Sequence, residues 1–403
     1  MFKLSPNNSR VKPFGTFKIF SAIALFGLLF GVIAQPGFDV RAAGEHFADP
    51  TALLKGKVKL GEQVYVGPFA TLLTDGAHEI AIGAESNVQD NVTLEATKGD
   101  IHLGEMVILA HGATVKGDAE LGEHGKCPVA TDKHCPSFVG FNSEVDGAVI
   151  EMDAMVTHLA RVAPGITLHS GLKVLPGKNV STQAEADDPN LGKVAEVTQA
   201  DRDFMHGVIE VNVEFAEQYA HLPAGELKGI NADPNTPFNA GKQIPSLNGL
   251  PTQDATFRNR IIGSVLLSNT LAQLDDVMGS RDSLRADEGS PFILGPIQHM
   301  GSNVTFHALE HTAVSIGVGG RFESGSLVHG GPNSFNSNTT SAGAGFRLGA
   351  KSVFFNSRIG GLGRVGYKTA VLGSDLGTAI NTRIGDCKIV NNGIAVGDVE
   401  WCY

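Results

Sequence analysis

The sequence predicts a mainly β protein with two tandem parallel β-helices, the first of which is followed by an α-helix. Three observations support this fold class. A six-residue pattern runs through residues 50–180 and resumes near residue 260. Glycine is frequent, with 50 residues in 403, whereas aromatic residues make up only 7%. Between the two patterned regions, one segment has helical spacing instead. Such a glycine-rich repeat suits coils that turn tightly every few residues.

The first predicted element is an export segment at residues 1–42. Basic residues precede an apolar stretch at 19–34, which has the length of a secretory signal and is short for a membrane span. Small-residue cleavage sites occur at 32–34 and 40–42. We therefore expect a signal peptide, with an uncleaved membrane anchor as the alternative. The expected location is the periplasm or an equivalent oxidising compartment.

The first β-helix, together with its C-terminal helix, is predicted over residues 50–221. Hexads such as "VGPFAT", "LGEMVI" and "LAHGAT" open on an aliphatic residue and continue with small residues. Three hexads form a triangular coil of about 18 residues, and the leading aliphatic side chains stack inward. A β-sandwich fits less well, because it would show alternating strands with turn signals at intervals of about 8–12 residues.

The spacing of apolar residues becomes helical within 183–221, which predicts an α-helix with Asp201 as a capping residue. Residues 222–254 are rich in Pro, Gly and Asn and are predicted to form a linker. The second β-helix is predicted over 255–403, where hexads return in stretches such as "FRLGAKSVFF". The polar stretch at 330–346 interrupts these hexads and is predicted to be an exposed loop.

The chain has four cysteines, an even number that suits an exported protein. Local pairing of Cys127 with Cys135 and of Cys387 with Cys402 is favoured among three possible pairings. A zinc site made of these cysteines is poorly supported, because no C-x-x-C motif is present.

The charge pattern restricts the class of partner. The formal net charge is -11 and the basic residues do not cluster in the sequence. Proteins that bind nucleic acid or anionic membrane surfaces usually carry a concentrated positive charge, so we expect neither kind of partner.

The repeat region resembles the gamma-class carbonic anhydrases. The shared stretches are "YVGPFATLLTD" (65–75), "SNVQDNVTL" (86–94) and "LAHGATVKG" (109–117). The resemblance covers most of 50–221 and, more loosely, 258–372. It implies left-handed β-helices that associate as trimers. It also implies a zinc-type metal held between neighbouring β-helices by three histidines, two from one β-helix and one from the other. Individual hexads are shared with acyltransferases.

When the family's motifs are carried over residue by residue, the first β-helix has an incomplete ligand set. It keeps His111 at the second ligand position, but Glu95 and Lys116 stand at the first and third. It also keeps the family's Gln-Asp pair as Gln89 and Asp90.

The second β-helix shows the reverse pattern. Its "LRADEG" stretch matches the arginine-x-acid-acid motif of the family, and histidines occupy the first and third ligand positions, whereas Ser324 stands at the second. The matching residues are Arg285, Asp287, Glu288, His307 and His329. His311 is a less favoured ligand, because residues four apart do not stack in a β-helix coil as they do on an α-helix.

Because the losses are complementary, we predict one metal site shared by the two β-helices, with His307 and His329 from the second and His111 from the first. Zinc is the expected metal, and iron or cobalt suits the same three nitrogen ligands.

The resemblance also implies roles for the residues around this site. Glu288 would carry protons and Gln89 would orient oxygen at the metal. Arg285 and Asp90 would form a bidentate ion pair across the interface, and Asp287 would be structural.

The expected activity is that of a metal-dependent lyase, the reversible hydration of CO₂ to bicarbonate. Two alternatives stay open. One is an inactive scaffold or assembly module with the same fold, and the other is a hexapeptide acyltransferase. We also expect self-association through β-helix faces into trimeric arrangements, in which further copies or a homologous gamma-type subunit supply the third β-helix.

Overall fold

The computed structural model describes residues 39–42, 45–129, 131–220, 259–263, 265–269, 271–286, 292–309 and 312–403. Most of the predicted export segment and the whole predicted linker, 222–254, lie outside these residues. So do three residues considered for the metal site, which are Asp287, Glu288 and His311. Among the described residues, no helix has the length and apolar character needed to cross a membrane.

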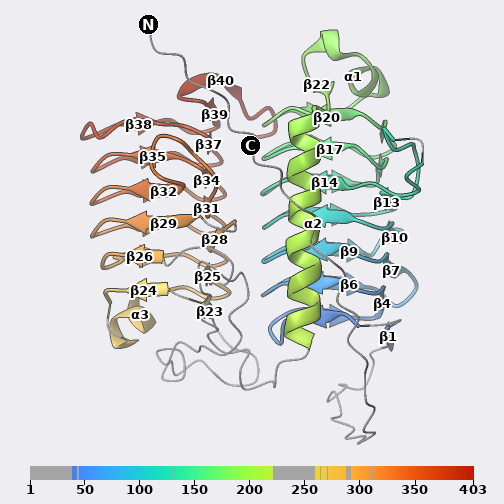
Figure 1. The fold of residues 1–403 in the computed structure, drawn as a ribbon, viewed down its shortest axis with the longest axis horizontal. Helices are drawn as coiled ribbons and strands as arrows, with labels where there is room; N and C mark the ends of the chain where they lie inside the picture. Colours follow the sequence, from blue (N-terminus) through green and yellow to red (C-terminus); the bar gives the residue numbers. More distant parts are fainter. Residues whose placement is uncertain are drawn as a thin grey trace, which may run out of the picture. The chain divides into compact units, whose positions relative to one another are not determined.

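The first β-helix has three sheets, and successive strands visit them in turn (Figure 1). One sheet contains β1 (Asp39–Ala42), β4 (Lys57–Leu60), β7 (Glu79–Ile82), β10 (Ile101–Leu103), β13 (Ala119–Leu121), β16 (Val149–Ile150) and β19 (Thr167–Leu168). The β2–β22 sheet contains β2 (Phe47–Ala48), β5 (Tyr65–Val66), β8 (Asn87–Val88), β11 (Val107–Leu109), β14 (Ser137–Val139), β17 (Met155–Val156), β20 (Leu172–Val174) and β22 (Val194–Glu196). The β3–β21 sheet contains β3 (Leu53–Lys55), β6 (Thr71–Thr74), β9 (Thr93–Ala96), β12 (Thr114–Lys116), β15 (Glu144–Asp146), β18 (Arg161–Val162) and β21 (Asn179–Val180).

The second β-helix is built in the same way. The β23–β40 sheet contains β23 (Arg260–Gly263), β25 (Ser283–Ala286), β28 (Thr305–Ala308), β31 (Leu327–Gly330), β34 (Val353–Phe355), β37 (Ala370–Leu372), β39 (Lys388–Asn391) and β40 (Ile394–Asp398). Another sheet contains β24 (Val265–Leu267), β26 (Phe292–Leu294), β29 (Ala313–Ile316), β32 (Thr339–Ala342) and β35 (Arg358–Ile359). The β27–β38 sheet contains β27 (His299–Met300), β30 (Arg321–Phe322), β33 (Arg347–Leu348), β36 (Arg364–Val365) and β38 (Arg383–Ile384). A short helix, α3 (Leu271–Val277), follows β24.

The predicted fold class, a mainly β protein made of parallel β-helices, is confirmed. Neighbouring strands pair in parallel, and the exceptions among the described strands are the antiparallel pairs β20–β22 and β39–β40. The polar stretch at 330–346 is not wholly a loop as predicted, because it contains β32. Thr340 and Ala342 of this strand point into the β-helix, while the alternate residues Thr339 and Ser341 point outward.

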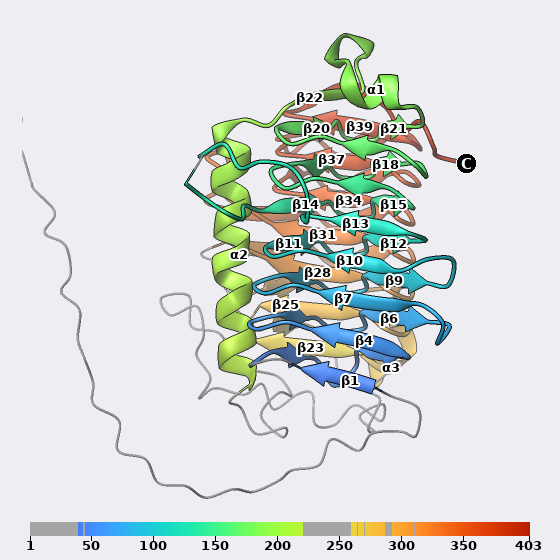
Figure 2. The ribbon, with the colours of Figure 1, turned by 90° about the vertical axis from the view of Figure 1, so that its right-hand side faces the viewer.

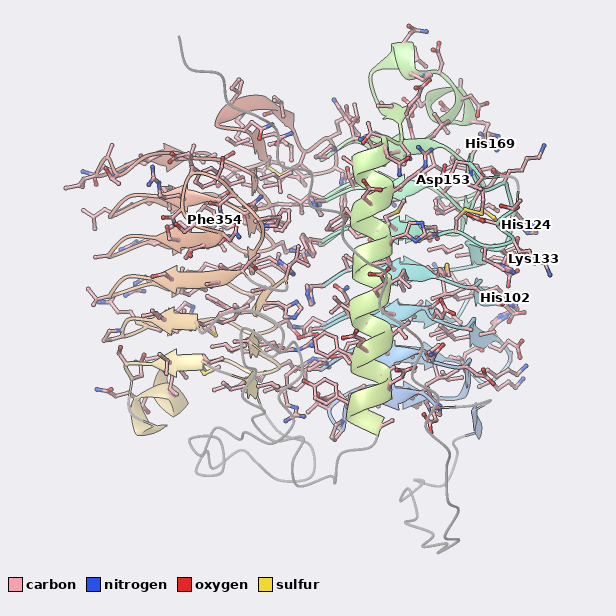
Figure 3. The ribbon with its side chains drawn as sticks, in the orientation of Figure 1. His102, His124, Lys133, Asp153, His169 and Phe354 are labelled. Atoms are coloured by element: carbon pink, nitrogen blue, oxygen red, sulfur yellow. A yellow bond between two sulfur atoms is a disulfide. The ribbon has the colours of Figure 1, made fainter. Side chains whose placement is uncertain are left out.

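The hexad pattern forms the core by stacking identical positions of successive coils. Val58, Ile80, Ile101 and Ala119 lie in register on neighbouring strands, and none of the four has any exposed surface. The second β-helix uses aromatic side chains for the same purpose. Phe354 lies inside it, as Figure 3 shows, and its ring centroid is 5.1 Å from that of Phe346.

Helix α2 (Gln199–Ala220) confirms the predicted helix and runs along the stack of coils of the first β-helix (Figures 1 and 2). Asp201 takes part in its N-cap, since the Asp201 N–H donates to Thr198 Oγ1 and the Thr198 N–H donates to Asp201 Oδ2. Arg202 makes two hydrogen bonds to the carboxylate of Asp153, which lies beside the helix in Figure 3. Two shorter helices, α1 (Gln183–Asp187) and η1 (Pro189–Leu191), precede it.

Both predicted disulfides are present. Cys127 bonds to Cys135, and Cys387 bonds to Cys402, with Cα–Cα distances of 5.7 and 5.8 Å. The first closes a surface loop. The second holds the C-terminus against β39.

The two β-helices lie side by side and share an interface (Figure 1). Asn91 Nδ2 donates to Thr305 Oγ1 at 3.0 Å, and Asn142 Nδ2 donates to the Gly325 carbonyl at 3.0 Å. A buried apolar cluster also crosses the interface, with Ile108 and Phe141 on one side and Leu327 on the other. Residues about 200 positions apart in sequence are therefore held in fixed relation.

A glycine corner allows a sharp test of the coil stacking. A Cβ atom added at Gly104 would lie 2.4 Å from the Gly122 carbonyl oxygen, which is too close for backbone atoms. Gly104→Ala is therefore expected to lower the free energy of unfolding by about 1–3 kcal/mol. Gly207→Ala, in open space on α2, is the matched control and should raise it by about 0.5–1 kcal/mol. Chemical denaturation measures both, and equal effects would contradict the stacking account.

Candidate metal centre

Three buried histidines converge at the interface of the two β-helices. His111 Nε2 lies 3.0 Å from His307 Nδ1, and His307 Nδ1 lies 3.3 Å from His329 Nε2. One nitrogen of each ring lies within 4.8 Å of the other two. The exposed fractions of the three side chains are 5% or less. These are the three histidines that the sequence predicts as ligands.

The register of the coils explains why two of them come from one sheet. His307 on β28 pairs directly with His329 on β31, and Phe355 on β34 continues the same column. On the other side of His307 the column continues with Arg285, on β25. The third histidine, His111, follows β11 at a corner of the first β-helix.

The corresponding column of the first β-helix holds different residues. Leu73, Glu95 and Lys116 lie in register on β6, β9 and β12. Glu95 accepts a hydrogen bond from Thr97, and Lys116 forms an ion pair with Glu144. This column therefore has no histidine with which to form a second site.

The hydrogen bonds of His329 fix which of its nitrogens faces the cluster. Its Nδ1 lies 2.7 Å from the Gly330 carbonyl oxygen, which can only accept a hydrogen bond. Nδ1 therefore carries the proton, and the lone pair of Nε2 points toward His307. A backbone carbonyl behind the ring is the arrangement that commonly orients a metal-binding histidine.

Burial keeps two of these rings, His111 and His329, uncharged. It lowers the pKa of His111 well below the usual 6.5, and the neighbouring His307, His329 and Arg285 lower it further. Burial is also the main reason why the pKa of His329 is well below 6.5. At neutral pH both imidazoles therefore have a lone pair available for a cation.

The spacing of the nitrogens fits a zinc-sized ion. A tetrahedral zinc ion bound at about 2.0–2.1 Å holds its nitrogen ligands about 3.3 Å apart. The separations of His307 from His111 and from His329, 3.0 and 3.3 Å, are close to this value, and the nitrogens of His111 and His329 lie within 4.8 Å of each other. Three neutral imidazole ligands with a further position left for a small molecule are typical of a catalytic zinc centre.

A buried ion pair crosses the interface beside the histidines. Arg285 Nη1 donates to Asp90 Oδ1 at 2.7 Å, and Ser283 Oγ donates to Asp90 Oδ2. The guanidinium also lies over the rings of Phe215 and Tyr65, with centroid distances of 4.8 and 5.4 Å. The sequence predicts Arg285 and Asp90 as partners in a bidentate pair, whereas in the structure the second carboxylate oxygen of Asp90 accepts from Ser283.

A second buried ion pair between the two β-helices was not predicted. Arg260 on β23 donates from Nη2 to Asp49 Oδ2 at 2.9 Å and from Nε to the same oxygen at 3.1 Å. Both side chains are almost fully buried. Neither residue belongs to a recognisable motif, so only the position of Arg260 at the start of the second β-helix could have suggested this role.

A small cavity lies next to the histidines. Its walls include His307, His329 and Gln89, together with apolar side chains of both β-helices and of α2, which are Phe138, Phe141, Phe204, Val208, Val211, Leu309 and Phe355. About 20 Å³ is open to the centre of a water molecule, which is room for one or two waters. Gln89 is held in place by a hydrogen bond from its Nε2 to Asn87 Oδ1.

His158 is a partly buried histidine for which the sequence predicts no role. Its ring stacks on Phe141 with a centroid distance of 4.5 Å, and Phe141 in turn lies 5.0 Å from the ring of His329. Its Nδ1 accepts a hydrogen bond from the Phe141 N–H. His158 therefore supports the aromatic wall of the cavity. By contrast, His102, His124 and His169 lie on the side of the first β-helix away from the second (Figure 3).

Comparison with known proteins agrees with this geometry. No family model matches the chain. The carbonic anhydrase of Methanosarcina thermophila is 30% identical over 196 residues, which are 43% of this chain and 72% of that protein. The chain belongs to the gamma-class carbonic anhydrase family.

The chain is also similar to two proteins that are not named as carbonic anhydrases. The carboxysome assembly protein CcmM of Nostoc is 27% identical over 195 residues, and these cover 46% of this chain and 32% of CcmM. The carnitine operon protein CaiE of Escherichia coli is 33% identical over 121 residues, which cover 30% of this chain and 55% of CaiE. Membership of the gamma class thus gives the fold and ancestry, while the activity has to be argued from the site.

Removing the charge of Asp90 tests the buried ion pair. Asp90→Asn removes the carboxylate that accepts from the buried Arg285 and from Ser283, and the free energy of unfolding is expected to fall by about 3 kcal/mol. Asp375→Asn is the matched control, because Asp375 forms a more exposed pair with Arg358 and should cost less than about 1 kcal/mol. Urea denaturation of both variants measures the difference, and similar small losses would contradict the structural importance of the pair.

The pH dependence of stability tests the burial of His158. Burial lowers the pKa of this ring from 6.5 to about 4, so between these values the unfolded chain binds more protons than the folded one. The contribution of His158 to the free energy of unfolding has its full value above pH 6.5 and is lost as the pH falls below 6.5. By pH 4 this loss amounts to about 3 kcal/mol. His158→Phe should flatten the curve between pH 6.5 and pH 4, because the variant has no imidazole to protonate at this position. An unchanged slope would contradict this.

Proposed function

We propose that this chain is an exported gamma-type carbonic anhydrase that interconverts CO₂ and bicarbonate at a metal site formed by His111, His307 and His329. The observation that carries the proposal is the convergence of three buried, inward-facing imidazole nitrogens from two β-helices. A zinc ion in such a site supplies Lewis-acid chemistry and activates water near neutral pH.

The residues around the histidines would hold the site in shape. The Gly330 carbonyl fixes the tautomer of His329, and the ring of Phe141 packs between His329 and His158. Gln89 stands at the cavity wall, where it can orient a small oxygen-bearing molecule by hydrogen bonding. The proton-carrying role that the resemblance implies for Glu288 remains part of the proposal.

The cavity supports CO₂ as the substrate. Its walls are largely aromatic and aliphatic, so they exclude bulk water and accept a small apolar molecule. Its open volume of about 20 Å³ is far below the few hundred Å³ typical of pockets for larger organic ligands. An acyl donor would need such a pocket, and this favours a carbonic anhydrase over a hexapeptide acyltransferase.

We infer one metal site for each chain. His307 and His329 form a pair only on the second β-helix, and the matching column of the first holds Glu95 and Lys116 instead. A third β-helix, from another copy or from a homologous gamma-type subunit, would therefore complete a trimeric arrangement without adding a second site of this kind. Two disulfides and the apolar N-terminal stretch support export to an oxidising compartment.

A scaffold without catalytic activity is the second candidate. The absence of two ligand histidines from the first β-helix favours it, and so does the similarity to CcmM, which is named as a carboxysome assembly protein. The buried, converging histidines weigh against it, because a scaffold has no need to keep three imidazoles together in its interior.

The decisive experiment measures metal content and CO₂ hydration in the same preparations of the full chain. The wild type should bind about one metal ion for each chain, and His111→Ala and His307→Ala should each lose the metal and at least about 100-fold in activity. His169→Ala removes an exposed histidine far from the cavity and is the control.

Metal retained in His111→Ala would contradict a site shared between the two β-helices. A wild-type chain that binds metal but does not hydrate CO₂ would favour the scaffold. Because all three histidines come from one chain in the structure, a mixture of His111→Ala and His307→Ala chains should not recover activity. Recovery would show that the site forms between chains.

A further inference from the structure

Four arginines stack in register on the outer surface of the β27–β38 sheet. Arg321 pairs with Arg347, Arg347 with Arg364, and Arg364 with Arg383, on β30, β33, β36 and β38. Neighbouring strands in a sheet lie about 4.8 Å apart, so the four guanidinium groups are attached at regular steps along the β-helix. We call this column the arginine ladder.

The arginine ladder is not neutralised within the described part of the chain. Arg347, Arg364 and Arg383 are exposed and pair with no carboxylate of the described residues, while Arg321 contacts the side-chain amide oxygen of Gln298. Like charges at adjacent positions on neighbouring strands repel each other. A column of this kind is therefore expected to have an anionic partner.

The equivalent surface of the first β-helix is covered. Ser324 stands at the position of His111, so β30 corresponds to β11 and the β27–β38 sheet corresponds to the β2–β22 sheet. The outward column of the β2–β22 sheet includes Ile108, Phe138 and Met155, and α2 packs against this apolar surface. Over the β27–β38 sheet, the described residues supply no helix.

A groove runs along the arginine ladder. Arg321, Arg347 and Arg364 form one side, and exposed apolar side chains at the adjoining corner form the other. The apolar residues Val318, Leu362 and Ile380 have exposed fractions of 57%, 48% and 70%. The groove has a volume of about 650 Å³ and suits an elongated partner with carboxylates along one line.

Such a line of carboxylates is present on the outer face of α2. Asp203, Glu210 and Glu214 are exposed, and Glu217 is partly exposed. Their spacing places all four within one stripe of an α-helix, on the side opposite the buried Met205, Val208 and Ile209. We call these four residues the acidic stripe.

The two features match in spacing as well as in charge. A helix rises about 1.5 Å per residue, so residues seven apart, such as Asp203 and Glu210, are separated by about 10.5 Å along the axis. Two steps of the arginine ladder are about 9.6 Å. Because α2 runs along the coils of its own β-helix (Figures 1 and 2), the acidic stripe follows the same direction as the coil stack.

We propose that the arginine ladder binds the acidic stripe of α2 on a second copy of this chain. In a symmetric pair each copy uses its arginine ladder and its acidic stripe once, which is the isologous arrangement expected for a closed dimer. None of these residues takes part in the histidine site, so the contact is separate from the proposed catalytic chemistry.

Charge reversal tests the contact. In the full chain, Arg347→Glu with Arg364→Glu should raise the Kd of self-association at least about tenfold, because attraction becomes repulsion. Asp203→Lys with Glu210→Lys should do the same. Analytical ultracentrifugation measures both, and self-association of the wild type should weaken as NaCl increases. Lys57→Glu with Lys59→Glu, an equal charge change on another face, is the control and should leave the Kd unchanged.

A mixture of the two reversed variants separates this partner from any other. A glutamate-bearing ladder then meets a lysine-bearing stripe, and the remaining pair keeps its native charges, so association should return to near the wild-type strength. Any of three results would overturn the proposal. Either reversed variant associates as strongly as the wild type, the wild-type chain does not self-associate, or the mixture of the two variants fails to associate. The metal content of both variants should stay at the wild-type value, which keeps this test independent of the proposed function.

Discussion

The buried contact between Asp90 and Arg285 is the interaction on which the rest of the site depends. The two charged groups lie 2.7 Å apart, and 1% or less of each side chain is exposed. Very few other relative positions of the two β-helices would keep this contact. A buried ion pair often adds little net stability, but it strongly disfavours arrangements that separate its members. The pair therefore acts mainly on specificity, because it sets the level at which one stack of coils meets the other.

That level decides whether three histidines can converge. A shift by one coil would move His111 by about 4.8 Å along the axis, past the reach of His307 and His329. Several contacts at other levels support the same alignment, including Arg260 with Asp49 and Asn142 with the Gly325 carbonyl. The site thus depends on the whole interface, although only three side chains form it.

The two β-helices differ at corresponding positions of the same fold. The column that carries His307 and His329 in the second β-helix carries Glu95 and Lys116 in the first, where Lys116 pairs with Glu144 instead. The sheet that supports α2 in the first β-helix carries the arginine ladder in the second. Corresponding faces of the two β-helices therefore carry different residues. This explains why neither copy alone matches the family motif.

The sequence by itself determined the β-helix fold, because hexads of aliphatic and small residues can bury their apolar positions only by stacking coils. It also determined which histidines to expect together, since complementary losses from two copies leave only one complete set. Only the tertiary structure decided the hydrogen-bond partner of His329, the buried pair of Arg260 and Asp49, and the role of His158, because these contacts join residues with no shared motif. The arginine ladder was hidden for a related reason. Its members follow one another at intervals of 26, 17 and 19 residues, so loops of unequal length conceal in the sequence a column that strand pairing makes regular in space.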